Sequence, residues 1–548
     1  MTGSASRRVA AAVTAVGLLA GLAACGRSAG GGGTAGDVSP TKGLVLTTPA
    51  GTKPVPSVTW AVYRPVYSLN PGFAFDYPEN TAVSLMCESL LRQAPDGSIG
   101  PGLATLSTPS ATRLVFTLRP GVTFWDGHPV TPADVVYSLD WMDNPAASYY
   151  TKVFSRVASI AATGADQVTI TLKQPDYWLA GELSSMPGVV FEKAFAQRAG
   201  KNFGQPGTGI MCTGAYKFKS WPAGGDITAA ANAGYWDSAV KPLVGQIVIT
   251  GVADTTSLTS GLLTGSISGT YYTGLPTLDQ LMASKAVKVY QGPGQATDAL
   301  IVANDKGVLG DLRVREALSL ALDRKAIIAN VYKGAALPSR WLANPGTFGY
   351  GKSVFTKAYD SSPELTQNLA KARKLVREAG AAGKTITIGT SSQIAGIAAV
   401  TGAYQQAAEA IGLKVNLKTV SAADYGNLFV LSDTKARAGM DCFLTVNYGD
   451  YADPAALLST FVLPGGSQNF DNFTDPKLTA LLERARGTAS PAARAALVAK
   501  AEELTMQELP WIPDVQPTVI TILGKGLTGA YASFSFMFSP WADQLGGS

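Results

Sequence analysis

Very few side chains in this chain of 548 residues are suited to covalent or acid–base catalysis. His128 is the only histidine, so a serine or cysteine hydrolase built on a histidine base would have to use it. It follows the turn-forming pair Asp126-Gly127, and no Gly-x-Ser-x-Gly elbow between a predicted strand and a predicted helix supplies a nucleophile. We therefore interpret His128 as a surface-turn residue and expect the protein not to be an enzyme.

Carboxylate pairs offer a second kind of chemistry. Asp450 and Asp453 lie in the block Asn447-Tyr448-Gly449-Asp450-Tyr451-Ala452-Asp453-Pro454. Two carboxylates can divide the roles of general acid and general base, but a chain with 39 acidic residues contains many such spacings. Pro454 suits the first turn of a helix, so Asp453 fits the N-cap position and Asp450 is the better candidate for binding a ligand.

Cysteine usage argues against a zinc site. The chain has four cysteines and one histidine, and no two cysteines have the Cys-x-x-Cys spacing of a metal-binding knuckle, which leaves too few ligands for a cysteine–histidine site. Cys25 lies at the end of an N-terminal apolar run. Cys87, Cys212 and Cys442 remain, and an odd number allows one disulfide at most; three buried free thiols are an equally good interpretation.

The N-terminus has the features of an export signal. A basic start precedes an apolar run, residues 9–22, that is well short of the ~20 residues of a membrane-spanning helix. The run ends in Leu22-Ala23-Ala24-Cys25, which is similar to the lipobox of bacterial lipoproteins. We therefore predict a lipoprotein signal peptide over residues 1–24 and lipidation of Cys25 with acyl chains that include palmitate. Two or more acyl chains anchor a protein stably to a membrane. An ordinary secretory signal is the alternative.

The composition changes after the signal. Residues 25–56 are rich in Gly, Ser, Thr and Pro and cannot bury enough apolar surface to order themselves, so we expect a flexible tether. The rest of the chain is long enough for two or more hydrophobic cores, and 46% of all residues are hydrophobic against 15% charged. The net charge is only +5 and no Lys/Arg cluster is present, so nucleic acid is not an expected partner.

Local patterns predict a mixture of strands and helices. Residues 114–118 alternate as in a strand, and Thr131-Pro132 is a typical helix start. After residue 304 the chain predicts a helix from Ser362-Pro363 to Gly380, strands at 385–388 and 413–420, and a helix at 398–411. Two strands joined by a crossover helix run parallel, so this part of the chain is predicted to be an α/β lobe.

Residues 111–139, with Asp126-Gly127 and Thr131-Pro132, carry the strongest family resemblance. Together with residues 313–324 and the block ending at Pro454, they resemble the family 5 extracellular solute-binding proteins, peptide-binding lipoproteins that feed ABC importers. Matching blocks follow in the family's order from Val58 to Pro513. The resemblance implies an α/β fold, a two-lobed periplasmic-binding-protein clamshell that is type II-like and of the large peptide-binding class.

The resemblance also implies a division of the chain. After the signal peptide (1–24) and the tether (25–56), it implies a first lobe at 57–298 with an extra subdomain at about 86–190, a second α/β lobe at 299–508, and a C-terminal return to the first lobe at 509–548. Cys87 and Cys212 both fall in the first lobe, which makes them the favoured pair if a disulfide forms.

The function implied is that of a substrate-binding lipoprotein of an ABC importer at the extracytoplasmic face of the cell membrane. Such a protein captures an oligopeptide or dipeptide between its lobes and delivers it to permease subunits, whose ATPases supply the energy. No cofactor and no metal are implied. Two alternatives stay open: the same role for a non-peptide ligand such as haem, a chelate or an oligosaccharide, and a regulatory or scaffold lipoprotein of the envelope that serves no transporter.

Site residues carry over from the family only where this sequence matches its motifs. Asp450 stands where peptide-binding members have an aspartate that pairs with the α-amino group of the peptide, and a partly desolvated pair of this kind is strong. Phe75-Asp76-Tyr77 matches a first-lobe segment that hydrogen-bonds the peptide backbone. Further ligand-binding candidates are Tyr149, Tyr150, Asn447 and Tyr448. Asn447 replaces an aromatic residue that is common in the family.

Overall fold

The computed structural model of the chain describes residues 43–392, 396–421 and 424–548. The predicted signal peptide, Cys25 and the first part of the predicted tether lie outside these residues. Within the described ranges, no helix combines the length and the apolar character needed to cross a bilayer.

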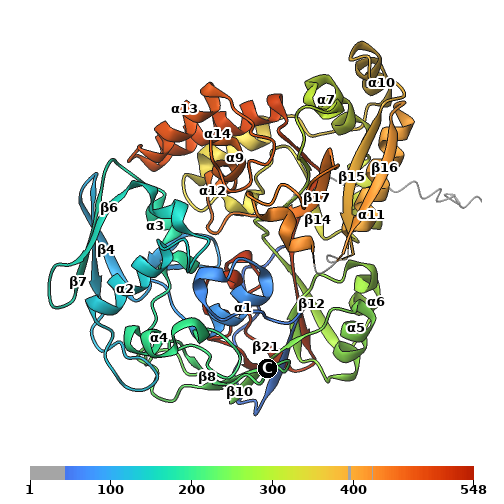
Figure 1. Cartoon of the computed structure of the whole chain (residues 1–548). Helices are drawn as coiled ribbons and strands as arrows, with labels where there is room; N and C mark the ends of the chain where they lie inside the picture. The colour runs from blue at the N-terminus through green and yellow to red at the C-terminus, as the bar shows by residue number, and fades with distance from the viewer. Residues whose placement is uncertain (1–42, 393–395, 422–423) are drawn as a thin grey trace, which may run out of the picture. The chain divides into compact units, whose positions relative to one another are not determined.

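A seven-stranded mixed sheet forms the centre of the first lobe (Figure 1). Its strands, in spatial order, are β12 (Val287–Gly292), β20 (Val519–Gly524), β11 (Gly269–Tyr271), β1 (Val58–Val62), β10 (Gln246–Gly251), β9 (Ile227–Ala231) and β8 (Tyr216–Ser220). Strand β1 runs parallel to both β10 and β11, whereas β20 is antiparallel to its two neighbours. A strand from the C-terminal part of the chain thus lies inside a sheet built mainly from the N-terminal half.

A five-stranded sheet forms the centre of the second lobe. Its order is β16 (Lys414–Val420), β15 (Thr385–Ser391), β17 (Cys442–Asn447), β13 (Thr297–Val302) and β18 (Trp511–Pro513). Strands β15 and β16 are parallel and are connected through α11 (Ile397–Ala410), which packs on both of them. The predicted α/β character of this lobe is therefore confirmed.

One predicted helix boundary in this lobe is wrong. The helix expected from Ser362-Pro363 begins only at Leu369, as α10 (Leu369–Glu378), and Ser362-Pro363 instead follows the end of α9 (Lys352–Ser361). Ser362 is the C-cap of α9, and the side chain of Asn368 accepts a hydrogen bond from the backbone N–H of Lys371 as the N-cap of α10. A Ser-Pro pair fits the end of one helix as well as the start of another, because a proline cannot continue the preceding helix.

A four-stranded antiparallel sheet is inserted between β1 and β8. It consists of β4 (Ala104–Ser110), β5 (Arg113–Leu118), β7 (Gln167–Leu172) and β6 (Val157–Ala162), and α2 (Pro132–Met142) packs on it. Thr131 and Asp134 form a capping box at the start of α2. Leu114, Phe116 and Leu118 are buried while the residues between them are not, so the strand and helix predicted in this segment are confirmed.

The remaining elements connect these three sheets. The other helices are α1 (Tyr77–Met86), α3 (Leu179–Glu182), α4 (Lys193–Ala199), α5 (Thr255–Thr264), α6 (Leu278–Met282), α7 (Leu312–Ala321), α8 (Arg324–Asn330), α12 (Pro454–Val462), α13 (Pro476–Arg486) and α14 (Pro491–Glu508). Three two-stranded ribbons pair β2 (Leu91–Gln93) with β3 (Ile99–Pro101), β14 (Ala336–Pro338) with β19 (Val515–Pro517), and β21 (Leu527–Thr528) with β22 (Gly546–Gly547).

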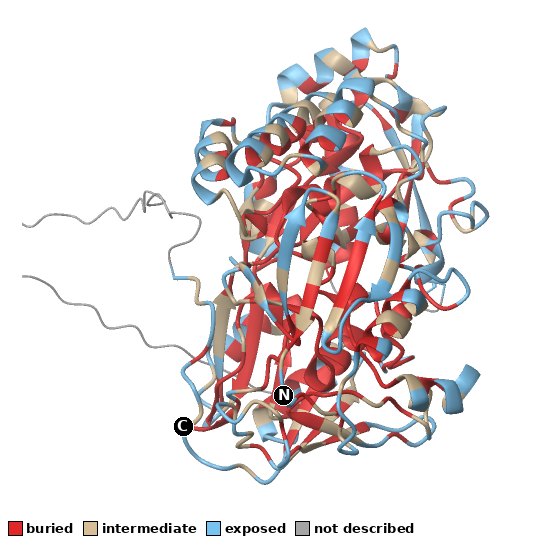
Figure 2. Ribbon diagram, turned by 90° about the vertical axis from the view of Figure 1, so that its left-hand side faces the viewer, coloured by how far each residue is buried: buried red, intermediate tan, exposed pale blue. Residues whose placement is uncertain are grey.

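Two hydrophobic cores lie within the described residues. The first contains Trp60, Phe116 and Trp541 of the first lobe. The second contains Trp341, Phe443 and Trp511 of the second lobe and extends into the seven-stranded sheet at β1, β12 and β20. Figure 2 shows buried residues along the strands and exposed residues on the outer faces of the helices. A disulfide joins Cys87 and Cys212 inside the first core, with Cα atoms 5.1 Å apart, whereas Cys442 is a buried free thiol in the second core.

The predicted tether extends too far into the folded body. From Gly43 to Pro56 the chain lies against its own C-terminal segment: the Thr48 hydroxyl donates to the Ala530 carbonyl (3.1 Å), and isolated bridges join Thr47 to Tyr531 and Lys53 to Gly547. Thr48 is fully buried. Backbone pairing with a distant segment, which composition does not reveal, orders a stretch that is poor in apolar residues.

Candidate functional site

A cavity of about 120 Å³ lies between the two large sheets. It is found at the ends of β1, β11 and β17, where the chain leaves the strands. Tyr63, Tyr77 and Tyr271 line it from the first lobe, and Tyr332 and Tyr448 line it from the second. A cavity of about 150 Å³ is large enough for a benzene ring, so this space suits one compact side chain.

The cavity wall is mostly apolar. Among the described residues Asp76 is the only charged one that lines it, and its carboxylate accepts hydrogen bonds from Arg64 (2.6 Å), from the Tyr77 backbone N–H (2.7 Å) and from the Tyr63 hydroxyl. Arg64 in turn donates to both oxygens of Glu79 at 2.8 Å. One arginine thus faces two carboxylates, so this group keeps a net negative charge, although three donors already occupy the Asp76 carboxylate.

Most hydroxyl groups around the cavity already have partners. The Tyr332 hydroxyl donates to Asp298 (2.7 Å), and the Tyr448 hydroxyl donates to the backbone carbonyl of Phe75 (2.9 Å). The Tyr271 hydroxyl is buried and has no hydrogen-bond partner among the described residues. One polar group in an apolar wall suits a ligand that forms a single hydrogen bond there.

Asp450 is a desolvated carboxylate without a cation. Among the described residues, no lysine, arginine or histidine forms an ion pair with it, although its backbone carbonyl accepts a hydrogen bond from Gln93 (2.8 Å). Burial raises the pKa of Asp450 to about 7. Burial raises the pKa of Glu182 to about 8, and the negative charge of nearby Asp450 contributes to this increase. This region therefore attracts positive charge.

The neighbouring Asp453 has a structural role instead. Its carboxylate accepts a hydrogen bond from the Ala455 N–H (2.9 Å), and Asp453 is the N-cap of α12, as its position before Pro454 predicts. The two aspartates of the block thus differ in the way the sequence suggests: one caps a helix and the other has no partner of opposite charge within the described residues.

The other sequence candidates fall into two groups. Asp76, Tyr77 and Tyr448 line the cavity, and the rings of Tyr77 and Tyr448 are 5.4 Å apart across it. The remaining candidates do not line it. Phe75 (47% exposed) packs against Tyr149 (60% exposed), the Tyr150 hydroxyl donates to the Ala74 carbonyl (2.5 Å), and buried Asn447 is hydrogen-bonded to Gln468.

Sequence reasoning missed several aromatic residues of the cavity wall, namely Tyr63, Tyr271, Tyr272, Tyr332, Phe534 and Phe536. The rings of Tyr271 and Phe536 are stacked, with centroids 3.5 Å apart. The alternation Phe534-x-Phe536-x-Phe538 was a signal available in the sequence. It had no predicted partner, because only the pairing of β20 with β11 brings the C-terminal aromatics to residues near the middle of the chain.

Ion pairs connect the inserted four-stranded sheet to the second lobe. Arg156 pairs with Glu483, Arg486 with Asp176 (2.5 Å), and Lys352 with Asp96 (2.9 Å). Each pair has one member from residues 96–176 and one from α9 or α13. The two lobes thus contact each other through these ion pairs as well as around the cavity.

Residues 346–353 have the spacing of an ATP-binding P-loop, Gly-x-x-x-x-Gly-Lys-Ser, but not its structure. The segment begins in a 3-10 turn, Pro345–Thr347, whereas a P-loop follows a strand. Lys352, the first residue of α9, is paired with Asp96 and is not free to bind a phosphate. The motif is therefore a chance match.

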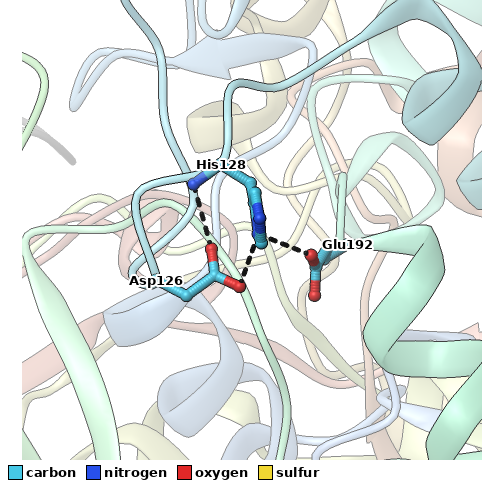
Figure 3. Close-up of side chains that lie close together, drawn as sticks. All are labelled: Asp126, His128 and Glu192. Carbon is cyan, nitrogen blue, oxygen red and sulfur yellow. Dashed lines mark hydrogen bonds and ion pairs between the residues drawn. The ribbon is translucent and has the colours of Figure 1, made fainter.

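One cluster within the described ranges brings three potential metal ligands together (Figure 3). It consists of Asp126, His128 and Glu192. His128 Nδ1 lies 2.9 Å from Asp126 Oδ2 and 3.3 Å from Glu192 Oε1. The hydrogen bond and the charge of Asp126 raise the pKa of His128 above its usual value. None of the three residues lines the cavity.

Comparison with known proteins shows which family has this arrangement. The chain is 26% identical to the periplasmic murein peptide-binding protein MppA of Escherichia coli over 486 residues, which cover 84% of this chain and 88% of MppA. Two solved structures share the fold. The Helicobacter pylori DppA complex with the peptide STSA has a TM-score of 0.77 at 20% identity, over 90% of this chain and 98% of DppA. The Agrobacterium AgaA complex with agropinic acid has a TM-score of 0.77 at 21% identity, over 90% and 99%.

These likenesses confirm the predicted two-lobed α/β clamshell. Residues 98–469, well over half of the chain, match the model of the bacterial extracellular solute-binding proteins, family 5. The chain belongs to the family 5 bacterial extracellular solute-binding proteins.

Proposed function

We propose that this protein is the lipid-anchored substrate-binding component of an ABC importer and that it captures peptides between its lobes. The observation that carries the proposal is Asp450, a half-buried, partly desolvated carboxylate with no positively charged partner among the described residues. A partly desolvated charge without compensation is costly, and a ligand ammonium group would remove that cost. The α-amino group of a peptide is such a cation, and the likeness to MppA supports a peptide as the ligand.

The wall between the lobes supports capture by closure. The Tyr448 hydroxyl of the second lobe donates to the Phe75 carbonyl of the first lobe. Asp450 itself does not line the cavity, and Phe75-Asp76-Tyr77 would lie alongside a peptide whose amino group reaches Asp450. Peptide backbone groups would bind to this segment, while the apolar cavity receives one side chain. Hinge closure would then bury the ligand and create the surface that the permease recognises, so that affinity depends on conformation.

The envelope context completes the proposal. Residues 1–24 would be removed as a signal peptide and Cys25 lipidated, which places the protein on the extracytoplasmic face of the cell membrane. The lobes would comprise 57–298 and 299–508, with 509–548 returning to the first lobe and about 86–190 forming the extra subdomain. Permease subunits and their ATPases are the partners; no catalytic role, cofactor or nucleic acid is part of the proposal.

The proposal is tested by identifying what the protein carries when purified. Native mass spectrometry of the wild type and of Asp450→Asn, followed by extraction and sequencing of any bound mass, separates the possibilities. A mixed set of peptides that the variant loses is the expected result. One non-peptide mass would replace the peptide by a ligand such as a chelate or an oligosaccharide. A protein that stays empty and binds no peptide would favour the envelope scaffold role.

The pH dependence of peptide affinity follows from the pKa of Asp450, about 7 in the ligand-free protein. Below pH 7 the carboxyl is protonated and has to release its proton before it can pair with an ammonium group, so affinity falls. Above about pH 8 the peptide α-amino group loses its own proton. We expect an affinity maximum between pH 7 and 8 in calorimetric titrations. In Asp450→Asn the decrease of affinity below pH 7 should be absent. If the decrease persists in this variant, another group causes it, and Glu182→Gln is the next variant to test.

The cavity predicts which side chains are accepted. Ala335 is buried in the wall, so Ala335→Leu should fill part of the space. We expect the variant to bind tripeptides with one Leu or Phe about tenfold more weakly than the wild type does, and to bind trialanine equally well, since overpacking costs about 1–3 kcal/mol. Isothermal titration of both peptide types measures this difference. Equal losses for both peptides would show that the cavity is not a side-chain pocket.

A further inference from the structure

The cluster of Asp126, His128 and Glu192 has a geometry suited to a metal ion. Asp126 and His128 belong to one tight turn, and Glu192 comes from the segment that leads into α4. Figure 3 shows the imidazole between the two carboxylates, and the three donor atoms all lie within 4.8 Å of one another. Around an ion with bonds of about 2.1 Å, neighbouring ligand atoms are about 3.0–3.4 Å apart. The separations from His128 Nδ1, 2.9 and 3.3 Å, fit this spacing.

Glu192 is the second observation that points to a bound cation. The residue is 5% exposed, and its Oε2 atom has no hydrogen-bond donor among the described residues. Within the described ranges, the basic groups at ion-pair distance from it are His128 and Arg198, whose side chains are 72% and 67% exposed. Asp126 and Asp134 add negative charge nearby. A buried carboxylate with such weak compensation is costly, and a cation held between it and Asp126 would remove this cost.

The ligands are held in position before any ion binds. The Phe124 N–H donates to the His128 carbonyl (2.8 Å), and Asp126 Oδ1 accepts from the His128 N–H (3.1 Å). On the other side, the Glu192 N–H donates to the Met211 carbonyl (3.1 Å). The Trp125 N–H donates to the carbonyl of Cys212, the next residue along the same segment (3.2 Å). Ligands fixed in this way lose little freedom on binding, which favours affinity.

We propose that Asp126, His128 and Glu192 form a binding site for a zinc-class divalent cation, separate from the cleft and independent of its ligand. One imidazole nitrogen and two carboxylate oxygens form a borderline donor set, which suits Zn²⁺, Ni²⁺ or Cu²⁺ better than Ca²⁺ or Mg²⁺. Water would complete the coordination on the exposed side. The bound ion would join the turn at residues 126–128 to the start of α4. The sequence alone disfavoured metal binding because it has one histidine, but carboxylates supply the other two ligands.

A proton competes with the metal for His128. Asp126 and Glu192 both face the imidazole and favour its protonated form, while Arg198 and Asp134 affect Glu192 with opposite signs. At acidic pH the protonated imidazole takes the position of the cation between the carboxylates, so metal affinity must fall as pH decreases. An ion pair without metal binding is the competing interpretation, and the two differ in a titration with metal.

Because His128 is the only histidine, protein labelled with ¹⁵N-histidine gives one imidazole spectrum. We expect ZnCl2 added to the untagged, EDTA-treated full chain at pH 7.5 to shift or broaden this spectrum until one equivalent has bound. The apparent affinity should be at least tenfold weaker at pH 5.5. Glu192→Gln and Asp126→Asn should each weaken it at least tenfold, and His128→Gln should abolish the site in calorimetry. Asp450→Asn is the matched control and should bind Zn²⁺ as the wild type does, whatever its effect on peptides.

Three results would contradict the proposal. One is an imidazole spectrum that does not change with Zn²⁺ up to about 1 mM, which would leave only the ion pair. Another is a titration whose midpoint is the same in Glu192→Gln and Asp126→Asn as in the wild type, which would place the ion elsewhere. A response to CaCl2 equal to that to ZnCl2 would also contradict a site selected by an imidazole ligand. Asp126 lies in an exposed turn, so its variant tests the site even if Glu192→Gln folds poorly.

Discussion

Replacing Asp450 by asparagine is expected to weaken the binding of a peptide with a free α-amino group by at least 100-fold. Truncating one partner of a buried, hydrogen-bonded charge pair typically costs about 2–5 kcal/mol, and about 1.4 kcal/mol corresponds to a factor of ten. Asparagine keeps the shape of the side chain but removes its charge, so the loss reports on the ion pair. Titration calorimetry at pH 7.5, where Asp450 is mostly ionised in the ligand-free protein, measures the change.

Two controls make the Asp450 prediction specific. An N-acetylated peptide has no ammonium group, so wild type and Asp450→Asn should bind it with similar, weak affinity. Asp360→Asn removes a carboxylate that is exposed on α9 and should leave both peptides unaffected. If Asp450→Asn binds the free-amino peptide as tightly as the wild type, Asp450 is not the anchor. Glu182, the nearby carboxyl whose pKa is also raised, would then be the next candidate.

Much of the fold could be predicted because its signals are local. Alternating apolar residues at 114–118 and the Thr131-Pro132 helix start correspond to β5 and α2. Predictions that depended on distant parts of the chain were less successful. Residues 43–56 adopt a defined conformation because they pair with the C-terminal segment. Ser362-Pro363 is compatible with either end of a helix, and in the structure it follows the end of α9. Local chemistry does not distinguish such cases.

The candidate site could be predicted only where a motif carried it. The Tyr448 hydroxyl contacts the Phe75 carbonyl, and Asp76, Tyr77 and Tyr448 line the cavity; all of these residues lie in blocks that resemble the family. The role of Asp76 could not be foreseen, because it shares an ion pair to Arg64, a residue with no motif of its own, with Glu79. The aromatic wall also escaped prediction, since Tyr271, Tyr332 and Phe536 come together only through strand order. Sequence motifs identify single residues, whereas a cavity depends on residues that several distant elements bring together.

The Cys87–Cys212 disulfide is expected to contribute about 5 kcal/mol to the free energy of unfolding. The two cysteines are 125 residues apart, and this loop encloses the whole four-stranded sheet with α2, so its closure strongly restricts the unfolded chain. In the chain-entropy account a loop of this length is worth roughly 5 kcal/mol. The double variant Cys87→Ala/Cys212→Ala should therefore unfold at a clearly lower urea concentration than the wild type, with the four-stranded sheet losing order first.

Reductant provides the matched control for this prediction. Dithiothreitol should lower the wild-type urea midpoint towards that of the double variant and leave the variant unchanged, because Cys442 is a free thiol that reduction does not alter. Thiol counting in denaturant supplies an independent check. Apart from Cys25, the unreduced wild type should show one reactive thiol and the reduced protein three. Three thiols before reduction would mean that the pair is not bonded. A double variant as stable as the wild type would mean instead that the loop is already restricted in the unfolded chain, because residual structure there limits what a cross-link contributes.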